Sequence, residues 1–172
     1  RRNKKEYTKL SEHIGAFPVV IVSPSDRDLI HEGSEARRRF LDGMLCQLSP
    51  SYLQALLRYN QVLSQRNGLL KLMAERQYFD PHTLAIYDEQ LALYGAPIFQ
   101  ERKAFLEAFL PTFQEQYTAL CQGKEQVAID YQSPLEGGNF RELLSQSRSQ
   151  DRAAQYTTVG IHKDDLSFSI AQ

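Results

Sequence analysis

The sequence predicts a mainly α-helical fold with a few β-strands, an α+β arrangement in which a long antiparallel helical hairpin packs beside a small sheet. Apolar residues recur at helical spacing over residues 50–77 and again over residues 81–123. Each of these segments opens with a polar cap followed by proline, Ser49-Pro50 and Asp80-Pro81. Short runs after Gly123 alternate apolar and polar residues, which is the pattern of strands.

The segments that precede the hairpin are shorter. Phe17–Val22 is a run of aromatic and β-branched residues, which predicts a strand buried on both faces and ended by Pro24. Ser34 is a good cap for a helix that continues to Leu45. In the second arm of the hairpin, glycine at position 95 and prolines at positions 97 and 111 predict kinks or short breaks.

The segments that follow the hairpin alternate strands with one helix. Gln126–Gln132 has the period of a strand, and Gly137-Gly138-Asn139 reads as a loop that caps a helix ending near Ser147. Residues 145–152 are polar, so we expect them to be mobile. Residues 156–160 and 166–170 predict two further strands on either side of a turn at residues 162–165.

Composition describes an ordinary globular chain. Its 172 residues, 42% hydrophobic and 24% charged, suit one domain, or one domain with an appendage. No apolar run approaches the roughly 20 residues of a membrane helix. The net charge of −1 neither favours nor excludes nucleic acid, but residues 1–9 carry five basic residues and one acidic residue. Lys4 and Lys5 are therefore candidate phosphate contacts, and a solvated basic terminus is the alternative.

The string His162-Lys163-Asp164-Asp165 is the segment with the strongest chemical character. Two carboxylates beside a histidine suggest a cation or an acid–base site. Neighbouring residues on a strand point to opposite faces, however, so we expect no metal site here. The sequence offers no Ser-His-Asp or Cys-His arrangement, and we assign no catalytic residue. Two interpretations stay open, a structural turn and a contact of His162 and Lys163 with nucleotide or DNA.

Three consecutive arginines, Arg37–Arg39, lie on the first predicted helix. At about 100° per residue they spread over about 200° of its circumference, so at most two face one ligand. A contact with DNA phosphate or across a dimer is one interpretation, and Arg37 is its first candidate. Ion pairing with Glu32, Glu35 and Asp42 on the same segment is the other.

Three groups of residues, in order, resemble the RecF family of bacterial ATPases of recombinational DNA repair. They are residues 17–26 with 32–42, residues 59–71 with their Gln-Arg-Asn string, and residues 158–166, so they span most of the chain. The family version of the last turn is Gly-Pro-His-Arg-Asp-Asp. This chain has Ile161 in place of proline and Lys163 in place of arginine, and lysine keeps the charge but loses the bidentate geometry.

The resemblance implies lobe II of an ABC-type, SMC-like ATPase head. It implies a cytoplasmic, ATP-dependent DNA-binding protein of replication restart, recombination and the SOS response. Such a protein uses ATP and Mg²⁺ in its full-length form, dimerises on ATP, and works on double-stranded or gapped DNA with RecR and RecO-like proteins. Asp26 lies in the turn where related heads couple nucleotide to the helical lobe, so it is a nucleotide-coupling candidate, with a simple helix cap as the alternative.

Motifs of nucleotide binding are missing from this sequence. It has no G-x-x-x-x-G-K-[ST] string, no signature helix start and no acidic Walker B strand. We therefore expect an internal fragment that binds no nucleotide and hydrolyses no ATP alone. In that interpretation residues 1–32 form a head strand and linker, 33–122 the hairpin arm, and 123–172 the strands that return to the head. The alternative is a stand-alone helical-hairpin adaptor without nucleotide.

Overall fold

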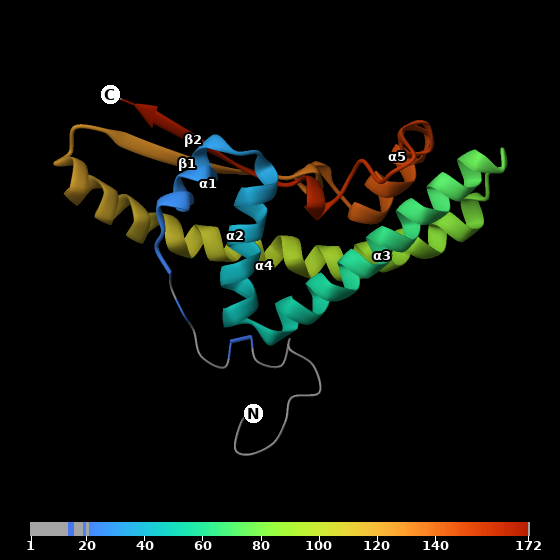
Figure 1. Cartoon of the computed structure of the whole chain (residues 1–172), viewed down its shortest axis with the longest axis horizontal. Coiled ribbons are helices and arrows are strands. Elements are labelled where there is room, and N and C mark those ends of the chain that lie inside the picture. The colour runs from blue at the N-terminus through green and yellow to red at the C-terminus, as the bar shows by residue number, and fades with distance from the viewer. Residues whose placement is uncertain (1–13, 16–18, 20, 172) are drawn as a thin grey trace, which may run out of the picture.

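The computed structural model describes residues 14–15, 19 and 21–171, and its long helices set the shape of the molecule (Figure 1). Helix α4 runs along the long axis, α3 lies beside it and α2 crosses it, while the sheet and α5 lie above these helices in this view. In chain order the elements are η2 (Pro24–Arg27), α1 (Asp28–His31), α2 (Ser34–Leu48), α3 (Pro50–Glu75), α4 (Pro81–Cys121), β1 (Gln126–Gln132), η3 (Pro134–Gly137), α5 (Phe140–Ala154), η4 (Ile161–Lys163) and β2 (Asp165–Ala171).

The predicted hairpin is confirmed by α3 and α4. The side chain of Ser49 caps α3 by accepting from the backbone N–H of Tyr52, and Asp80 caps α4 in the same way. Helix α4 holds 41 residues, or about 60 Å of helix, without the expected break. Gly95 serves packing there, since a Cβ at this position would lie 2.5 Å from the Phe140 ring and 3.0 Å from the Tyr59 ring.

The sheet has two strands and confirms two of the predicted ones. Strand β1 pairs with β2 in antiparallel register, from Gln126 opposite Ala171 to Gln132 opposite Asp165. The strand predicted over residues 156–160 is wrong, because side chains bind the backbone of this segment. The N–H of Thr157 donates to Asn67 Oδ1 at 2.7 Å, and the N–H of Thr158 donates to Asp151 Oδ1 at 2.8 Å.

Two other predictions need correction. The described residues of the run Phe17–Val22 are irregular and exposed, with Val22 at 86%, and residues 17, 18 and 20 lie outside the described part. The only sheet among the described residues is β1–β2, and the described residues of this run are not part of it. Helix α5 continues past Ser147 to Ala154, and residues 145–152 are helical because Ser147 and Asp151 are buried against its neighbours.

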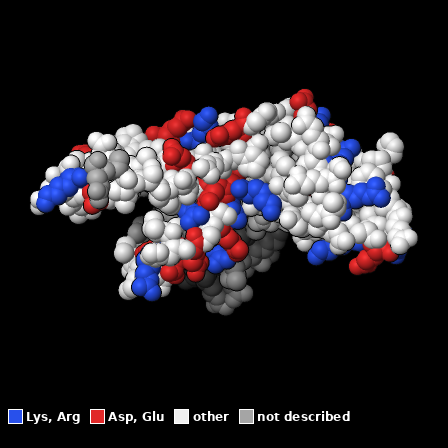
Figure 2. Space-filling view, turned by 90° about the horizontal axis from the view of Figure 1, so that it is seen from above, with Lys and Arg blue, Asp and Glu red and all other residues white. Residues whose placement is uncertain are grey.

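Charged side chains are mixed on the surface above the sheet. Figure 2 shows Lys and Arg interspersed with Asp and Glu over this face, without one continuous patch of either sign. The described helices include none that is both long enough and apolar enough to cross a membrane.

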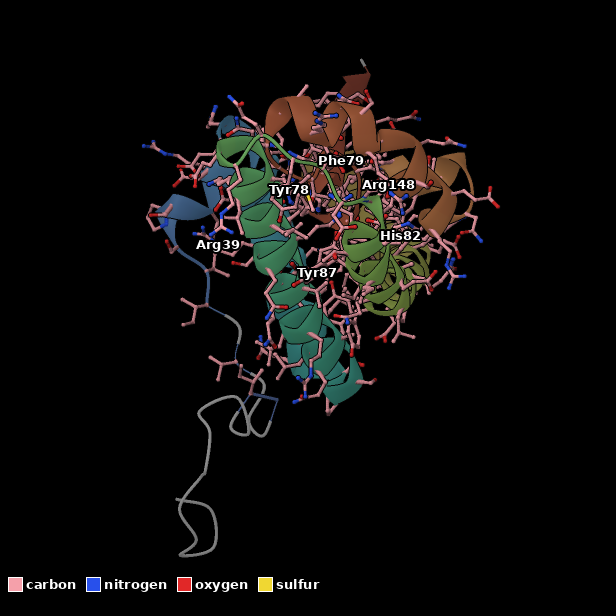
Figure 3. The ribbon with its side chains drawn as sticks, turned by 90° about the vertical axis from the view of Figure 1, so that its right-hand side faces the viewer. Arg39, Tyr78, Phe79, His82, Tyr87 and Arg148 are labelled. Atoms are coloured by element: carbon pink, nitrogen blue, oxygen red, sulfur yellow. The ribbon has the colours of Figure 1, made fainter. Side chains whose placement is uncertain are left out.

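The main core lies where α2, α3, α4 and α5 meet. Its most buried members are Tyr52, Tyr59, Leu91, Ile98 and Leu144, each of which is fully buried. A second, smaller cluster of Leu70, Met73 and Leu84 closes the hairpin tip beneath Phe79, which Figure 3 labels. The Arg152 guanidinium lies 5.0 Å from the centroid of the Phe79 ring, so a cation covers the outer face of this tip.

Candidate functional site

A buried arginine on α4, Arg102, is the centre of the first of two polar networks. Its side chain is 1% exposed. Its Nη2 donates to Asp42 Oδ1 at 2.7 Å, and its Nη1 donates to Asp164 Oδ2 at 2.6 Å and to the carbonyl of Ile161 at 2.8 Å. Its Nε donates to the hydroxyl of Tyr52 at 3.0 Å. We call this group, completed by Tyr131 and Ser133, the Arg102 network.

Two carboxylates in the Arg102 network also accept hydrogen bonds from hydroxyl groups. Asp164 accepts from Tyr131 at 2.5 Å and from Ser133 at 2.6 Å, while Asp42 accepts from Tyr52. Burial raises the pKa of both tyrosines above its ordinary value, so they stay protonated and donate. The network therefore fastens β1 and the turn before β2 to α2, α3 and α4.

Arg66 on α3 is the centre of the second network and is 0% exposed. Its Nε donates to Asp88 Oδ1 at 2.9 Å, and its Nη1 donates to Asp151 Oδ2 at 2.7 Å and to Thr157 Oγ1 at 2.9 Å. Arg148, labelled in Figure 3, donates to the other oxygen of Asp88 at 2.7 Å. The Nη2 of Arg66 has no hydrogen-bond partner among the described residues. This Arg66 network ties α5 and the segment after it to the hairpin.

Residues 157–165 form the turn that contacts both networks, and His162 lies at its centre. The Nε2 of His162 is 3.0 Å from the carbonyl of Thr157, and its Nδ1 is 2.8 Å from the hydroxyl of Tyr59. A carbonyl only accepts, so Nε2 carries the hydrogen and Nδ1 accepts from Tyr59. Burial lowers the pKa of His162 to about 4, which keeps the ring neutral at pH 7.

Gly160 allows this turn to pack closely against α3. Its φ of +143° is a conformation that side chains disfavour. A Cβ added there would lie 2.3 Å from the Tyr59 hydroxyl and 3.0 Å from His162 Nδ1. A larger residue at position 160 would therefore disrupt the contact between Tyr59 and His162.

The three consecutive arginines have three different partners. Arg37 binds both oxygens of Asp165, at 2.7 and 3.1 Å, and this bond lowers the pKa of Asp165. Arg38 donates to the carbonyl of Asp164 at 2.6 Å. Arg39 forms an exposed pair with Glu35 at 2.9 Å. The expected pairing within the segment is thus found for Arg39, while Arg37 and Arg38 reach the turn before β2.

The other predicted site residues are spread over the molecule. Lys163 is exposed, with its ammonium 4.9 Å from the centroid of the Tyr156 ring. Asp26 caps η2 by accepting from the N–H of Ser23 at 2.8 Å. Asp26 and Arg37 both line an apolar groove between α1, α2, α4 and the sheet. Lys4 and Lys5 lie outside the described residues. Of the six candidates, the structure brings Arg37, His162 and Lys163 to one turn.

Asp164 lies before β2 and binds Arg102, whereas Asp165 is the first residue of β2 and binds Arg37. Within the described residues no cluster of three or more His, Cys, Asp or Glu could hold a metal. The sequence reasoning missed Arg66 and Arg102. A signal existed for Arg66, which falls on the apolar stripe of α3 with Tyr59, Val62 and Leu70.

Curated proteins similar to this chain are named DNA replication and repair protein RecF. The relative from Flavobacterium johnsoniae is 49% identical over 170 residues, which are 99% of this chain and 47% of that protein. The relative from Parabacteroides distasonis is 46% identical over 170 residues, again 99% of this chain and 46% of that protein. The chain therefore spans about half the length of the curated relatives it matches. No profile of a known protein family matches it.

Two solved structures share the fold, and both are of the recombination mediator protein RecF in the RecFOR pathway. The one described as RecF-ATPrS has a TM-score of 0.86 and 32% identity, over 95% of this chain and 46% of that one. The one described as RecF-ATP has a TM-score of 0.83 and 32% identity, over 92% of this chain and 44% of that one. These comparisons confirm the resemblance and the mainly α-helical fold with a small sheet.

Proposed function

We propose, from a resemblance to RecF that covers almost the whole chain, that this chain is the helical lobe of an ATP-dependent DNA-binding protein of recombinational repair. In this proposal residues 33–122 form the arm, 1–32 the linker from the head, and 123–172 the strands that return to it. ATP and Mg²⁺ bind to the remainder of the protein, because this chain has no phosphate-binding loop. DNA, RecR and RecO-like proteins, and a second copy held by ATP, are the proposed partners.

The observation that carries the proposal is an apolar groove of about 520 Å³ between α1, α2, the second half of α4 and the sheet, which no other described residue covers. It is lined mainly by Leu29, Ile30, Phe40, Leu41, Met44, Phe105, Leu106, Phe109, Phe113, Tyr117, Val127, Ile129, Leu166, Phe168 and Ile170. Four of its rings follow one another along α4, with centroids 5.7–6.0 Å apart. Exposed apolar side chains that gather in one groove, here Ile30, Phe40 and Ile170, are typical of an interaction site. We infer that the ATP-binding part of the head covers it.

The sheet supports the same assignment. It consists of β1 and β2 alone in the described part of the chain, so each strand has one outer edge without a strand beside it. Open edges are sites for further strands. Strands of the ATP-binding part would extend this sheet and lie over the groove.

We propose that Asp26 couples nucleotide to this lobe, and that Arg37, predicted as a DNA or dimer contact, also takes part, because both residues line the groove. Arg37 connects the carbonyls of Leu29 and Glu32 to Asp165 at the start of β2. A displacement of η2 and α1 would therefore be transmitted to the sheet through the Arg37 guanidinium. Asp26 lies at the beginning of that segment, facing the side where the nucleotide-binding part would dock.

A chimera tests the proposal. The matching segment of the Flavobacterium johnsoniae relative is replaced by this chain, and the purified product is examined by size-exclusion chromatography with and without ATP. We expect ATP-dependent dimerisation and restored survival of ultraviolet light in a strain that lacks the relative. A folded chimera that neither dimerises nor restores survival contradicts the proposal and favours the stand-alone adaptor.

Matched substitutions locate the interface in the chimera. Phe109→Glu places a carboxylate in the groove, so we expect it to abolish dimerisation and repair. Leu93→Glu is the control, since Leu93 is 66% exposed on α4 and does not line the groove. Equal effects of the two substitutions would show that the groove is not the docking surface.

A further inference from the structure

Helix α3 has no acidic residue before its last position, Glu75, whereas charges of both signs are mixed on the surface in Figure 2. The sequence contains no Asp or Glu from Gly43 to Ala74. We propose that a groove on one side of α3 binds the backbone phosphates of a DNA strand. This α3 groove is formed by Asn60, Ser64, Asn67, Gly68 and Lys71, with Arg38 and Arg39 at its α2 end. The inference rests on the proposed function, to which it adds a location for DNA.

The α3 groove consists of two neighbouring hollows along the helix. Asn60, Ser64, Asn67 and Lys71 are spaced at four, three and four residues, so they lie on one side of α3 over about 16 Å. They line a hollow of about 510 Å³. A second hollow of about 370 Å³, lined by Arg38, Arg39 and His162, shares Asn60 with the first. In Figure 3 Arg39 lies on the opposite side of α3 from His82 of α4.

The side chains of the groove are those that contact phosphates in protein–DNA complexes. Hydroxyl and amide groups of serine and asparagine, with lysine and arginine, supply most contacts to the DNA backbone. The pair between Arg39 and Glu35 is 79% exposed on both sides, so it is weak and Arg39 can exchange its partner for a phosphate. Asp42, the other acidic residue at this end, is already paired with Arg102.

Gly68 provides a second, independent observation. A glycine within a helix costs about 1 kcal/mol relative to alanine. Packing does not require it, because a Cβ at this position would meet nothing within 4 Å. Glycine leaves the backbone open to a ligand that approaches closely, and Gly68 lines the first hollow. Gly43 of α2 is equally free of neighbours but lines neither hollow, which makes it a matched control.

The test measures binding of the 172-residue chain to a fluorescent single-stranded oligonucleotide and to its duplex by anisotropy, at several salt concentrations. We expect Lys71→Glu to weaken binding at least about tenfold at low salt and to reduce the salt slope by about 1. Ser64→Glu and Gly68→Glu should weaken it by a similar factor. The controls are Lys103→Glu, on an exposed site of α4, and Gly43→Glu, which should both stay within about twofold. Residues 1–9 are present in every variant and control, so the difference between Lys71→Glu and Lys103→Glu reports on the groove and not on this basic segment.

Three results overturn the inference. The first is a chain that does not bind either oligonucleotide at low salt. The second is equal weakening by Lys71→Glu and Lys103→Glu. The third is displacement of the oligonucleotide by polyglutamate at lower concentration than by unlabelled DNA, which would assign the groove to an acidic protein segment. Dimerisation of the chimera on ATP reports on the proposed lobe, and oligonucleotide binding reports on the groove, so either can fail without the other.

Discussion

The Arg102 and Arg66 networks differ in how they neutralise their aspartates. Each buries a guanidinium between two aspartates, but the Arg66 network holds a second cation, Arg148, and the Arg102 network does not. The Arg102 network compensates with hydroxyl donors from Tyr52, Tyr131 and Ser133. A buried carboxylate is tolerated only when it is paired and hydrogen-bonded. Arg102 alone therefore neutralises the two aspartates beside the sheet, whereas Arg66 and Arg148 together neutralise the two aspartates beside α5.

The strongest test of this difference is Arg102→Met, which keeps most of the volume and removes the only cation of its network. Asp164 is 1% exposed and would remain buried without a positive partner, and Asp42 would lose its cation too. We expect a loss of about 4–5 kcal/mol in the free energy of unfolding, measured by urea denaturation. A loss below about 1 kcal/mol would mean that the hydroxyl donors alone stabilise the carboxylates.

The second test, Arg66→Met, should cost less, about 3 kcal/mol, because Arg148 still neutralises Asp88. Only Asp151 loses its cation, and it keeps hydrogen bonds from Thr158. Adding Asp151→Asn to Arg66→Met should recover part of the loss in the same denaturation experiment. If Arg66→Met costs as much as Arg102→Met, the second cation does not explain the difference between the networks.

His162 lies in the turn between the networks and should make stability depend on pH. Its folded pKa of about 4 is below the ordinary 6.5, so the neutral form is favoured on folding. This contribution is fully present above pH 6.5 and is lost as the pH falls toward 4, by about 2 kcal/mol at pH 5. We expect His162→Gln, measured by urea denaturation from pH 7.5 to 4.5, to remove this slope. Identical slopes in the two proteins would show that His162 is protonated without cost.

The smallest expected effect belongs to the exposed pair of Arg39 and Glu35. Both side chains are 79% exposed, and pairs of this kind four residues apart contribute about 0.3–0.5 kcal/mol. Arg39→Ala should therefore change the free energy of unfolding by less than about 0.5 kcal/mol. A loss above about 1 kcal/mol would mean that exposed and buried arginines in this protein do not differ as the comparison requires.

The hairpin could be predicted because its signals are local. Ser49-Pro50 and Asp80-Pro81 define the starts of α3 and α4 within a few residues, and the apolar period defines their faces. The run Phe17–Val22 has an equally strong local signal, yet its described residues are not a strand. A strand needs a neighbour for its backbone hydrogen bonds, and no period in one segment reveals whether that neighbour is present.

The site was predictable only in part. The turn at residues 162–165 was found from its chemistry, but the strand argument for Asp164 and Asp165 did not apply, because β2 begins only at Asp165. The partners of this turn were not found, since Arg102 and Asp164 are 62 residues apart and Arg66 and Asp151 are 85 apart. Contacts over such separations depend on how helices cross, which a single sequence does not encode in any local pattern.

Pro97 gives α4 a mechanical property that follows from the two networks. It lies between Asp88 and Arg102, which are 14 residues or about 21 Å apart on nearly one side of the helix. Proline has no N–H, so the hydrogen bond that would stiffen the helix against the carbonyl of Leu93 is missing. The helix therefore bends more easily between its two anchored residues than a stretch with every backbone hydrogen bond in place, and Pro111 has the same effect beyond Arg102. A force applied to the sheet should therefore tilt the part of α4 that contains Arg102 relative to the part that contains Asp88. The distance between these two residues along the helix axis should stay the same.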